Sequence, residues 1–245
     1  MDTRRYRGKL GRAKYVSMLD LKAGFHNVPF EKTSSYMACF TTHRGIYRWL
    51  RMPMGLTQAP AHFQRVVEAA LNPEGARKLP VVVYLDDVAV YGDDEAQLLE
   101  DTAEAVKRLA TFGFMLNLKK SQLAHAAAKV LGHQWTSGGY WSPTTHKLEA
   151  IAAMTDEELS RTNRASLFGL LNFFREYVPT FAEQVEPLRE LLGQDSKLWT
   201  PQATKAVRGL VGQVMGTCRW MNPAIDEELR MEVWLSPGGL AAVVL

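Results

Sequence analysis

Two adjacent aspartates stand between two runs of β-branched residues in the stretch VVVYLDDVAV, residues 81–90. Valine runs of this kind predict a buried pair of strands, with Asp86 and Asp87 at the point where the chain turns back. Neighbouring carboxylates bind protons more tightly unless a cation lies between them. Aspartate is also common in solvated turns, and on residue type alone a plain turn is the more frequent explanation. The stretch therefore predicts a hairpin whose tip is either a solvated turn or a metal site.

A third acid, Asp20, follows the strand-like segment YVSML at residues 15–19. Three acids at the ends of adjacent strands would suit two divalent cations, because magnesium takes oxygen ligands and keeps several waters. Two such ions, about 3.5–4 Å apart, can hold the attacking and leaving oxygens of a phosphoryl transfer. The spacing of the acids thus favours phosphoryl-transfer chemistry if the three strand ends meet.

Hydrophobic periodicity divides the chain near residue 142. Before this point we expect strands and two helices, one starting at Thr57 with Pro60 in its first turn and one over residues 94–112. Asp94 and Gln97 fit a capping box for the second helix, and Gly113 fits its C-terminal stop. Besides 15–19 and the valine pair, short strands are expected at residues 24–30, 36–42, 45–53, 114–118 and 129–135. Beyond the boundary we expect helices at residues 146–154, 164–178 and 180–193, then a strand, a Pro-Gly-Gly turn and a strand at 231–245.

The charge of the chain is uneven, although its net value is only +3. Six basic residues stand against one acid in the first fourteen positions, and they are Arg4, Arg5, Arg7, Lys9, Arg12 and Lys14. A disordered leader or a phosphate-binding arm explains such a run equally well. Two cysteines without metal-like spacing, Cys39 and Cys218, favour a reducing intracellular compartment. The sequence contains no long apolar run, which argues against secretion and against a membrane span.

Six segments follow one another in a fixed order: SMLDLKAGFHNV, RWLRMPMGLTQAPAHFQR, VVVYLDDVAVY, GFMLNLKKSQ, KVLGHQW and SLFGLLNFFREYV. This series resembles the polymerase of gypsy-type LTR retrotransposons, in the reverse transcriptase family, over about residues 10–245. The resemblance implies an α+β fold with a right-hand polymerase palm, an antiparallel sheet with helices on one face, then a helical thumb and a partial connection. Four regions are expected: a basic remnant of the fingers at 1–14, the palm at 15–142, the thumb at 143–195, and at 196–245 the connection with a truncated RNase H-like beginning.

The function that this resemblance implies is RNA-directed DNA polymerisation by two-metal-ion nucleotidyl transfer to a primer 3′-hydroxyl. The expected partners are an RNA template, a DNA primer, their hybrid and a dNTP, with two Mg²⁺ ions, which Mn²⁺ could replace. We also expect a homodimer or a larger polyprotein, no membrane, and a location in a cytoplasmic particle or the nucleus. RNase H activity is not expected, because no aspartate follows Asp226 and the chain reads WLSPGG where relatives open that domain. An inactive remnant that binds nucleic acid or a protein, and a plain α/β domain with an acidic turn, are the alternatives.

The resemblance also assigns roles to single residues. The proposed metal ligands are Asp20, Asp86, Asp87 and the backbone carbonyl of Leu21, and Lys120 would protonate the departing pyrophosphate. The expected nucleotide site consists of Phe25, as the gate against a ribose 2′-hydroxyl, with Met54, Gly55 and Tyr84. The expected contacts to primer and template are Leu131, Gly132 and His133 at the primer grip and Asn163, Arg164 and Arg175 in the thumb. For Phe25 a core position, and for Lys120 and the thumb residues a solvated surface, are the competing explanations.

Overall fold

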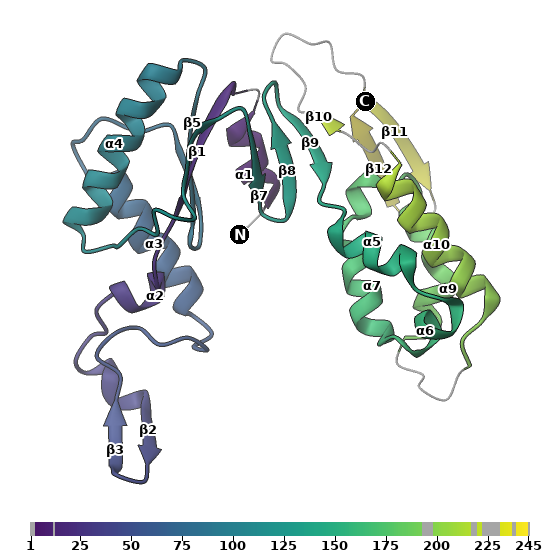
Figure 1. The fold of residues 1–245 in the computed structure, drawn as a ribbon, viewed down its shortest axis with the longest axis horizontal. Helices are drawn as coiled ribbons and strands as arrows, with labels where there is room; N and C mark the ends of the chain where they lie inside the picture. Colours follow the sequence, from purple (N-terminus) through teal and green to yellow (C-terminus); the bar gives the residue numbers. More distant parts are fainter. Residues whose placement is uncertain are drawn as a thin grey trace.

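A four-stranded antiparallel sheet forms the centre of the first half of the chain (Figure 1). The computed structural model of the protein describes residues 3–11, 13–192, 198–216, 220–221, 231–236 and 239–244, with side chains described between residues 7 and 216 of these ranges. The sheet consists of β1 (Tyr15–Asp20), β4 (Val81–Tyr84), β5 (Asp87–Gly92) and β6 (Gln122–His125). Its order is β4-β5-β1-β6, so the valine-rich hairpin predicted from the sequence is confirmed as β4 and β5.

The side chains on the two faces of this sheet pack into different hydrophobic clusters. Val83 and Val88 pack in a cluster with side chains of α3 (Ala59–Leu71) and α4 (Glu95–Thr111). Val82 and Ala89, their neighbours along the strands, belong to a second cluster that lies on the opposite face. The predicted α+β architecture, an antiparallel sheet with α3 and α4 packed on one face, is therefore confirmed, and the N-terminal helix described below packs on the other face.

The two helices on the sheet end close to their predicted limits. In α3 the first helical residue is Ala59 rather than Thr57, because Gln58 is the N-cap, and Pro60 lies in the first turn as predicted. In α4 the Asp94 side chain accepts a hydrogen bond from the backbone N–H of Gln97. Gly113 follows this helix with a φ of 85°, a conformation that glycine adopts without strain.

The basic N-terminal segment is a helix, α1 (Thr3–Leu10), that packs inside the molecule. The side chain of Leu10 is 1% exposed and lies in the second cluster, with Val16, Trp135 and Trp141. Arg7 is 3% exposed. Figure 1 shows α1 between the first sheet and the strands that follow it. A free, disordered leader is therefore the wrong description for the part of this segment that the structure describes.

A second sheet, in the order β10-β9-β8-β7, follows the first. Its strands are β7 (Ala127–Val130), β8 (His133–Thr136), β9 (Tyr140–Pro143) and β10 (Trp220–Met221). The prediction of one strand at 129–135 was wrong. Leu131 and Gly132 have φ values of 50° and 78°, so the chain turns there and the segment becomes a hairpin.

Two further predicted strands are replaced by other structure. Residues 24–30 contain the short helix α2 (Gly24–Asn27) instead of a strand, and the backbone N–H of Val28 closes it by donating to the carbonyl oxygen of Phe25 at 3.2 Å. Residues 114–118 contribute a single β-bridge, between Leu116 and Leu21. The predicted strands at 36–42 and 45–53 shrink to the 3₁₀ turn Ser34–Met37, β2 (Cys39–Thr42) and β3 (Gly45–Arg48), which form a separate hairpin.

Residues after 143 form the predicted helical unit. Its helices are α5 (His146–Ala153), α6 (Asp156–Arg161), α7 (Arg164–Phe173), the 3₁₀ turn Arg175–Tyr177, α8 (Phe181–Gln184), α9 (Glu186–Arg189) and α10 (Pro201–Met215). Leu167, Leu171, Phe174 and Tyr177 share one buried cluster, so this stripe serves packing, as predicted. Val207 and Leu210 of α10 lie in the same cluster, although α10 follows the boundary expected at residue 195.

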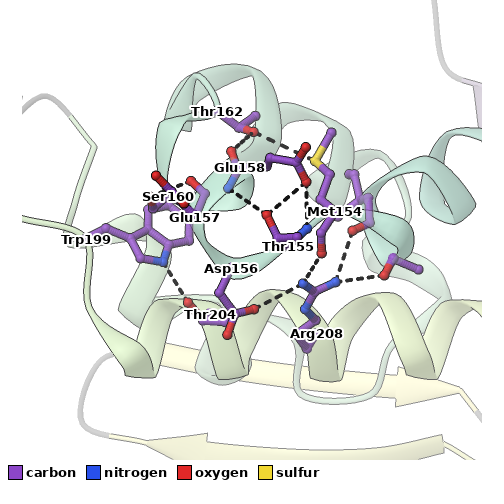
Figure 2. A network of polar contacts seen from close by, with 12 residues as sticks. Met154, Thr155, Asp156, Glu157, Glu158, Ser160, Thr162, Trp199, Thr204 and Arg208 are labelled. Carbon is purple, nitrogen blue, oxygen red and sulfur yellow. Dashed lines mark hydrogen bonds and ion pairs between the residues drawn. The ribbon is translucent and has the colours of Figure 1, made fainter.

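A polar network fastens α10 to the start of the helical unit (Figure 2). Arg208 on α10 donates hydrogen bonds to the backbone carbonyl oxygens of Ile151, at 3.1 Å, and Ala152, at 2.9 Å, and to that of Met154. Its guanidinium also lies 3.1 Å from a carboxylate oxygen of Asp156. These carbonyls lie at the C-terminal end of α5, where Ile151 also accepts a bond from the N–H of Met154, and Arg208 adds a side-chain cap from α10.

The last described strands are β11 (Met231–Ser236) and β12 (Gly239–Val244), which pair with each other. They match the predicted terminal hairpin, whereas residues 237–238 of the predicted Pro-Gly-Gly turn lie outside the described residues. Asp226 and the side chains of the WLSPGG segment lie outside them as well. Among the helices that the structure describes, none is both long enough and apolar enough to cross a membrane.

Candidate active site

The pairing of β1 with β5 brings two of the three predicted acids face to face. Asp20 and Asp87 are direct partners in this antiparallel register. Val82, Ala89 and Met18 lie in or against the second cluster, and strand alternation puts Asp20 and Asp87 on that same face of the sheet. Direct partners on one face have Cβ atoms roughly 4.5–5.5 Å apart, and like charges there oppose each other. The fold therefore holds two carboxylates together against their repulsion.

Asp86 occupies the tip of the β4–β5 hairpin. Tyr84 pairs with Asp87, so the connection has two residues, Leu85 and Asp86. The backbone N–H of Leu21 donates a hydrogen bond of 3.3 Å to the carbonyl oxygen of Asp86. This bond ties the tip to the end of β1, where Asp20 lies.

Gly24 lies against the side chain of Asp86. A Cβ atom added at Gly24 would overlap Asp86 Oδ1 and would lie 2.7 Å from Phe63 Cζ. Only glycine fits between an acid at the hairpin tip and a ring of α3. Nothing in the sequence distinguished Gly24 from the other glycines, so this requirement is visible in the structure alone.

Burial and neighbouring charge both disfavour ionisation of Asp86 and Asp87. Burial raises the pKa of Asp86 above its ordinary value, and the charge on Asp20 raises it further. The pKa of Asp87 is raised by burial first and then by the charges of Asp20 and Asp86. The ion pairs between described residues involve other acids. Asp86 Oδ1 is buried without a hydrogen-bond partner. A bound cation would lower these two pKa values, so the chemistry of Asp86 and Asp87 suits a cation.

The same residues do not form a complete metal cage. Within the described part of the chain, no three His, Cys, Asp or Glu side chains are grouped so that they could hold a metal ion by themselves. Magnesium rarely uses such a cage, because it keeps several waters and takes one or two carboxylates together with phosphate oxygens of a substrate. Two facing carboxylates and an unpartnered third therefore fit magnesium better than a metal that needs an all-protein site.

A turn after α4 fixes the other side of the site. The backbone N–H of Asn117 donates to the carbonyl oxygen of Asp20 at 2.8 Å, and the N–H of Asp20 donates to Ser121 Oγ at 3.2 Å. Lys120 is exposed and lies between these two residues on the same turn. Asn117 and Ser121 were not predicted, because such bonds leave no periodic signal in a sequence.

The predicted nucleotide residues fall into two groups. Phe25, on α2, is half-buried and stacks on Phe63, with ring centroids 4.7 Å apart, one residue from the glycine that touches Asp86. Tyr84 is half-buried and pairs with Asp87. Met54 is 70% exposed, and Gly55 has a φ of 90° with open space around it.

The predicted primer grip is the tip of the β7–β8 hairpin. His133 is 5% exposed, its Nδ1 lies 2.8 Å from the hydroxyl of Tyr177, and its ring stacks on Phe173 at 4.8 Å. Burial lowers the pKa of His133 to about 4, with a further contribution from Arg7 that Glu176 partly offsets. His133 thus joins the second sheet to the helical unit.

Two of the three predicted thumb residues have partners inside the helical unit. The Asn163 side chain caps α7 by accepting a hydrogen bond of 2.9 Å from the N–H of Ser166. Arg164 donates to the carbonyl oxygen of Leu191 at 3.3 Å. Arg175 is exposed. The structure therefore gives Asn163 and Arg164 structural contacts and leaves Arg175 facing solvent.

Comparison with known proteins gives a consistent result. Residues 2–135 match the family model described as reverse transcriptase (RNA-dependent DNA polymerase). The retrovirus-related Pol polyprotein from transposon 297 of Drosophila melanogaster is 32% identical over 193 residues, or 79% of this chain and 18% of that protein. The transposon Tf2-3 polyprotein of Schizosaccharomyces pombe is 25% identical over 203 residues, or 82% of this chain and 15% of that protein. The chain thus spans less than a fifth of the length of these curated relatives.

A solved structure extends the likeness to the fold. The foamy viral protease-reverse transcriptase in complex with an RNA/DNA hybrid superposes with a TM-score of 0.79 at 26% identity. The match covers 98% of this chain and 35% of the viral chain. It therefore includes both the sheet that carries the acids and the helical unit.

Proposed function

Because the chain belongs to the reverse transcriptase (RNA-dependent DNA polymerase) family, we propose that it is the polymerase core of a gypsy-type LTR retrotransposon. The observation that carries the proposal is the pairing of Asp20 with Asp87 beside Asp86, with raised pKa values for Asp86 and Asp87. The transposon polyproteins that it resembles support the origin. The reaction would be the addition of a deoxynucleotide to a primer 3′-hydroxyl, directed by an RNA template.

In this proposal Asp20, Asp86, Asp87 and the backbone carbonyl of Leu21 hold two magnesium ions, and manganese could replace them. When bound, the ions would lower the pKa of the primer 3′-hydroxyl and neutralise charge on the triphosphate. The carboxylates would orient the ions. Asp20 and Asp87 repel each other, and a bound cation would relieve this repulsion. Lys120, exposed on the turn that holds Asp20, would donate a proton to the departing pyrophosphate.

Phe25 would form the floor of the sugar site. Its ring is fixed by stacking on Phe63, and a fixed ring can exclude a 2′-hydroxyl because the wall behind it does not yield. Met54 and Gly55 would lie under the incoming base, where the exposed Met54 side chain can adapt to its partner. Tyr84 would support the nucleotide site from β4.

The duplex would bind between the palm and the thumb. The complex of the similar viral enzyme with an RNA/DNA hybrid supports a hybrid as the bound nucleic acid. The tip at Leu131, Gly132 and His133 would approach the primer. Asn163 and Arg164 at the start of α7, and Arg175 after its end, would lie near phosphates. We assign residues 15–142 to the palm and 143–216 to the thumb, which adds α10 because its side chains share the thumb core. Residues beyond 216 would lead into a connection and an RNase H-like domain.

Primer extension on an RNA template, with magnesium titrated from zero, tests the proposal. The wild-type chain should extend the primer only with the metal, and Asp87→Asn should abolish extension. Glu100→Gln, which changes an exposed acid of α4, is the matched control and should extend as wild type does. A wild-type chain that binds an RNA–DNA hybrid without extending its primer is instead a nucleic-acid-binding remnant.

Replacement of Phe25 by alanine tests the sugar gate. The ratio of ribonucleotide to deoxynucleotide incorporation should rise, while overall extension slows because packing on the sugar is lost. If Phe25 serves the core alone, the variant loses about 3–5 kcal/mol of stability and keeps the wild-type ratio. Phe112→Ala, at a half-exposed ring of the α4 end, is the control for loss of a phenyl group.

A further inference from the structure

The hairpin tip that carries Asp86 is held from behind by one side chain of α3. Gln64 is 7% exposed. Its Oε1 accepts a hydrogen bond of 2.8 Å from the backbone N–H of Leu85. Its Nε2 donates to the carbonyl oxygen of Val83 at 2.9 Å and to Glu68 Oε1 at 2.8 Å. The three hydrogen bonds of the buried amide are therefore directed at the hairpin and at one residue of its own helix.

The backbone that Gln64 contacts is in an uncommon conformation. Leu85 has a φ of 53°, a left-handed value that side chains with a Cβ atom rarely adopt. The two backbone groups bonded by Gln64 lie on either side of Tyr84, directly before Asp86. Contacts from outside the hairpin can hold Leu85 in this conformation, and Gln64 provides two of them, one to the end of β4 and one to Leu85 itself.

Few side chains could replace Gln64 at this place. A primary amide supplies an acceptor for Leu85 and a donor for Val83 from one planar group. Glutamate would keep the acceptor and lose the donor, and methionine would keep the length and lose both. The partners also fix the orientation of the amide. If it were flipped, its NH₂ group would face the N–H of Leu85, and its oxygen would face the oxygens of Val83 and Glu68.

We propose that Gln64 is a positioning residue for the polymerase reaction, which sets the place of the Asp86 carboxylate through the backbone of Val83 and Leu85. It touches no reacting atom, and it acts together with Gly24, which leaves room for the same carboxylate on the other side. The inference rests on the proposed polymerase function. Residues that orient metal ligands typically change metal affinity or activity by about 10–100-fold when they are replaced.

Gln64→Met is the test, with Gln202→Met as the control because it makes the same change at an exposed site of α10. Single-nucleotide addition should show kcat reduced about 10–100-fold, with the KM for dNTP nearly unchanged. Binding of Mn²⁺ to the protein without nucleotide, followed by electron paramagnetic resonance, should weaken by a similar factor. The control should match wild type in each measurement.

A rescue separates positioning from general stability. Glycine adopts a positive φ without strain, so Leu85→Gly in the Gln64→Met background should restore part of kcat and of Mn²⁺ affinity. A purely structural role for Gln64 predicts a lower melting temperature, with wild-type kcat and Mn²⁺ affinity below that temperature, and this result would overturn the proposal. If Gln64→Met does not fold, Gln64→Glu takes its place, and wild-type kcat in that variant also overturns it.

The two proposals fail in different ways. A wild-type chain that binds Mn²⁺ but extends no primer contradicts the polymerase function, and the Mn²⁺ affinity of Gln64→Met still decides the role of Gln64. A wild-type chain that extends primers, with Gln64→Met equally active, contradicts the positioning role alone.

Discussion

The β4–β5 and β7–β8 hairpins have the same length of connection and differ in everything that surrounds it. Each turns through two residues, Leu85 and Asp86 in the first and Leu131 and Gly132 in the second. The first tip is fastened within the palm, by Gln64 of α3, and carries an acid whose Oδ1 is buried without a hydrogen-bond partner. The second tip is fastened across to the helical unit, where a Cβ added at Gly132 would lie 2.9 Å from Phe173 Cζ.

The difference shows that a hairpin tip takes its role from the elements that hold it. A tip that is tied to its own core can keep repelling charges in place, which a metal site requires. A tip that is tied to a neighbouring unit transmits the position of that unit instead. The four predictions below each alter one side of this comparison.

The largest effect is expected at the first tip. Asp86→Asn should reduce primer extension by at least about 10³-fold, because several kcal/mol of charge stabilisation depend on the bound metal. The free energy of unfolding without metal should stay the same or rise slightly at pH 7. The pKa of Asp86 lies above its ordinary value, so ionisation destabilises the folded state as pH rises through that pKa, and Asn removes this cost. Urea unfolding without metal measures it, and a large loss of stability would show that Asp86 is a structural turn residue.

The second tip should respond to acid. The pKa of His133 is lowered to about 4, so between pH 6.5 and 4 the unfolded chain binds a proton that the folded chain excludes. Stability should therefore fall as pH decreases through this window, by an amount on the order of 3 kcal/mol. Urea unfolding at a series of pH values measures the slope. His133→Phe should remove this part of the slope and His62→Gln, at an exposed histidine, should keep it; an unchanged slope in His133→Phe would contradict the assignment.

Gly132→Ala should cost about 2 kcal/mol, from a left-handed backbone and from overlap with Phe173. Gly75→Ala is a matched control, because Gly75 has the same φ of 78° and no atom within 4 Å of an added Cβ. The difference between the two variants isolates the contact with the thumb ring. Phe173→Leu should recover part of the loss in the Gly132→Ala background, and equal losses at Gly132 and Gly75 would show that the second tip does not press on the thumb.

The smallest effect is expected at the ion pair between α1 and the thumb. Arg7 lies 2.5 Å from Glu176, with side-chain exposures of 4% and 41%. A double-mutant cycle with Arg7→Met and Glu176→Gln should give a coupling free energy of about 1 kcal/mol, since one partner stays in contact with water. A coupling of zero would show that the ion pair does not help to join palm and thumb. Other contacts, such as that of His133 with Phe173, would then hold the two together.

The parts of the fold that follow a hydrophobic period were predictable from the sequence. The parts that depend on one contact between residues far apart in the sequence were not. Valine runs gave β4 and β5, and the apolar stripe gave α4 within a residue at each end. The short helix at Gly24 was missed, because its four residues are too few to show a helical period, and the contact of Gly24 with Asp86 and Phe63 leaves no pattern in the sequence. The burial of α1 was missed because its basic residues suggested a solvated segment.

The residues of the candidate site also divide into those that the sequence predicted and those that it did not. The three acids could be selected because they follow strands, and strand pairing then places two of them opposite each other. Gln64, Asn117 and Ser121 could not be selected, since each bonds to backbone groups that are far away in sequence. A bond to a backbone group does not depend on the residue type of the partner, so the sequence carries no sign of it.

The position of α1 has a consequence for the order in which the molecule can form. Arg7 and Glu176 are 169 residues apart, and Leu10 is buried against tryptophans of the second sheet. A ribosome that adds about 5–20 residues per second needs roughly ten to thirty seconds between the two ends of this contact. During that interval α1 has been synthesised without its last partner. A chain released before the thumb is made could bury Leu10 against the second sheet, but Arg7 would lack Glu176, so the first helix of this chain completes its contacts late.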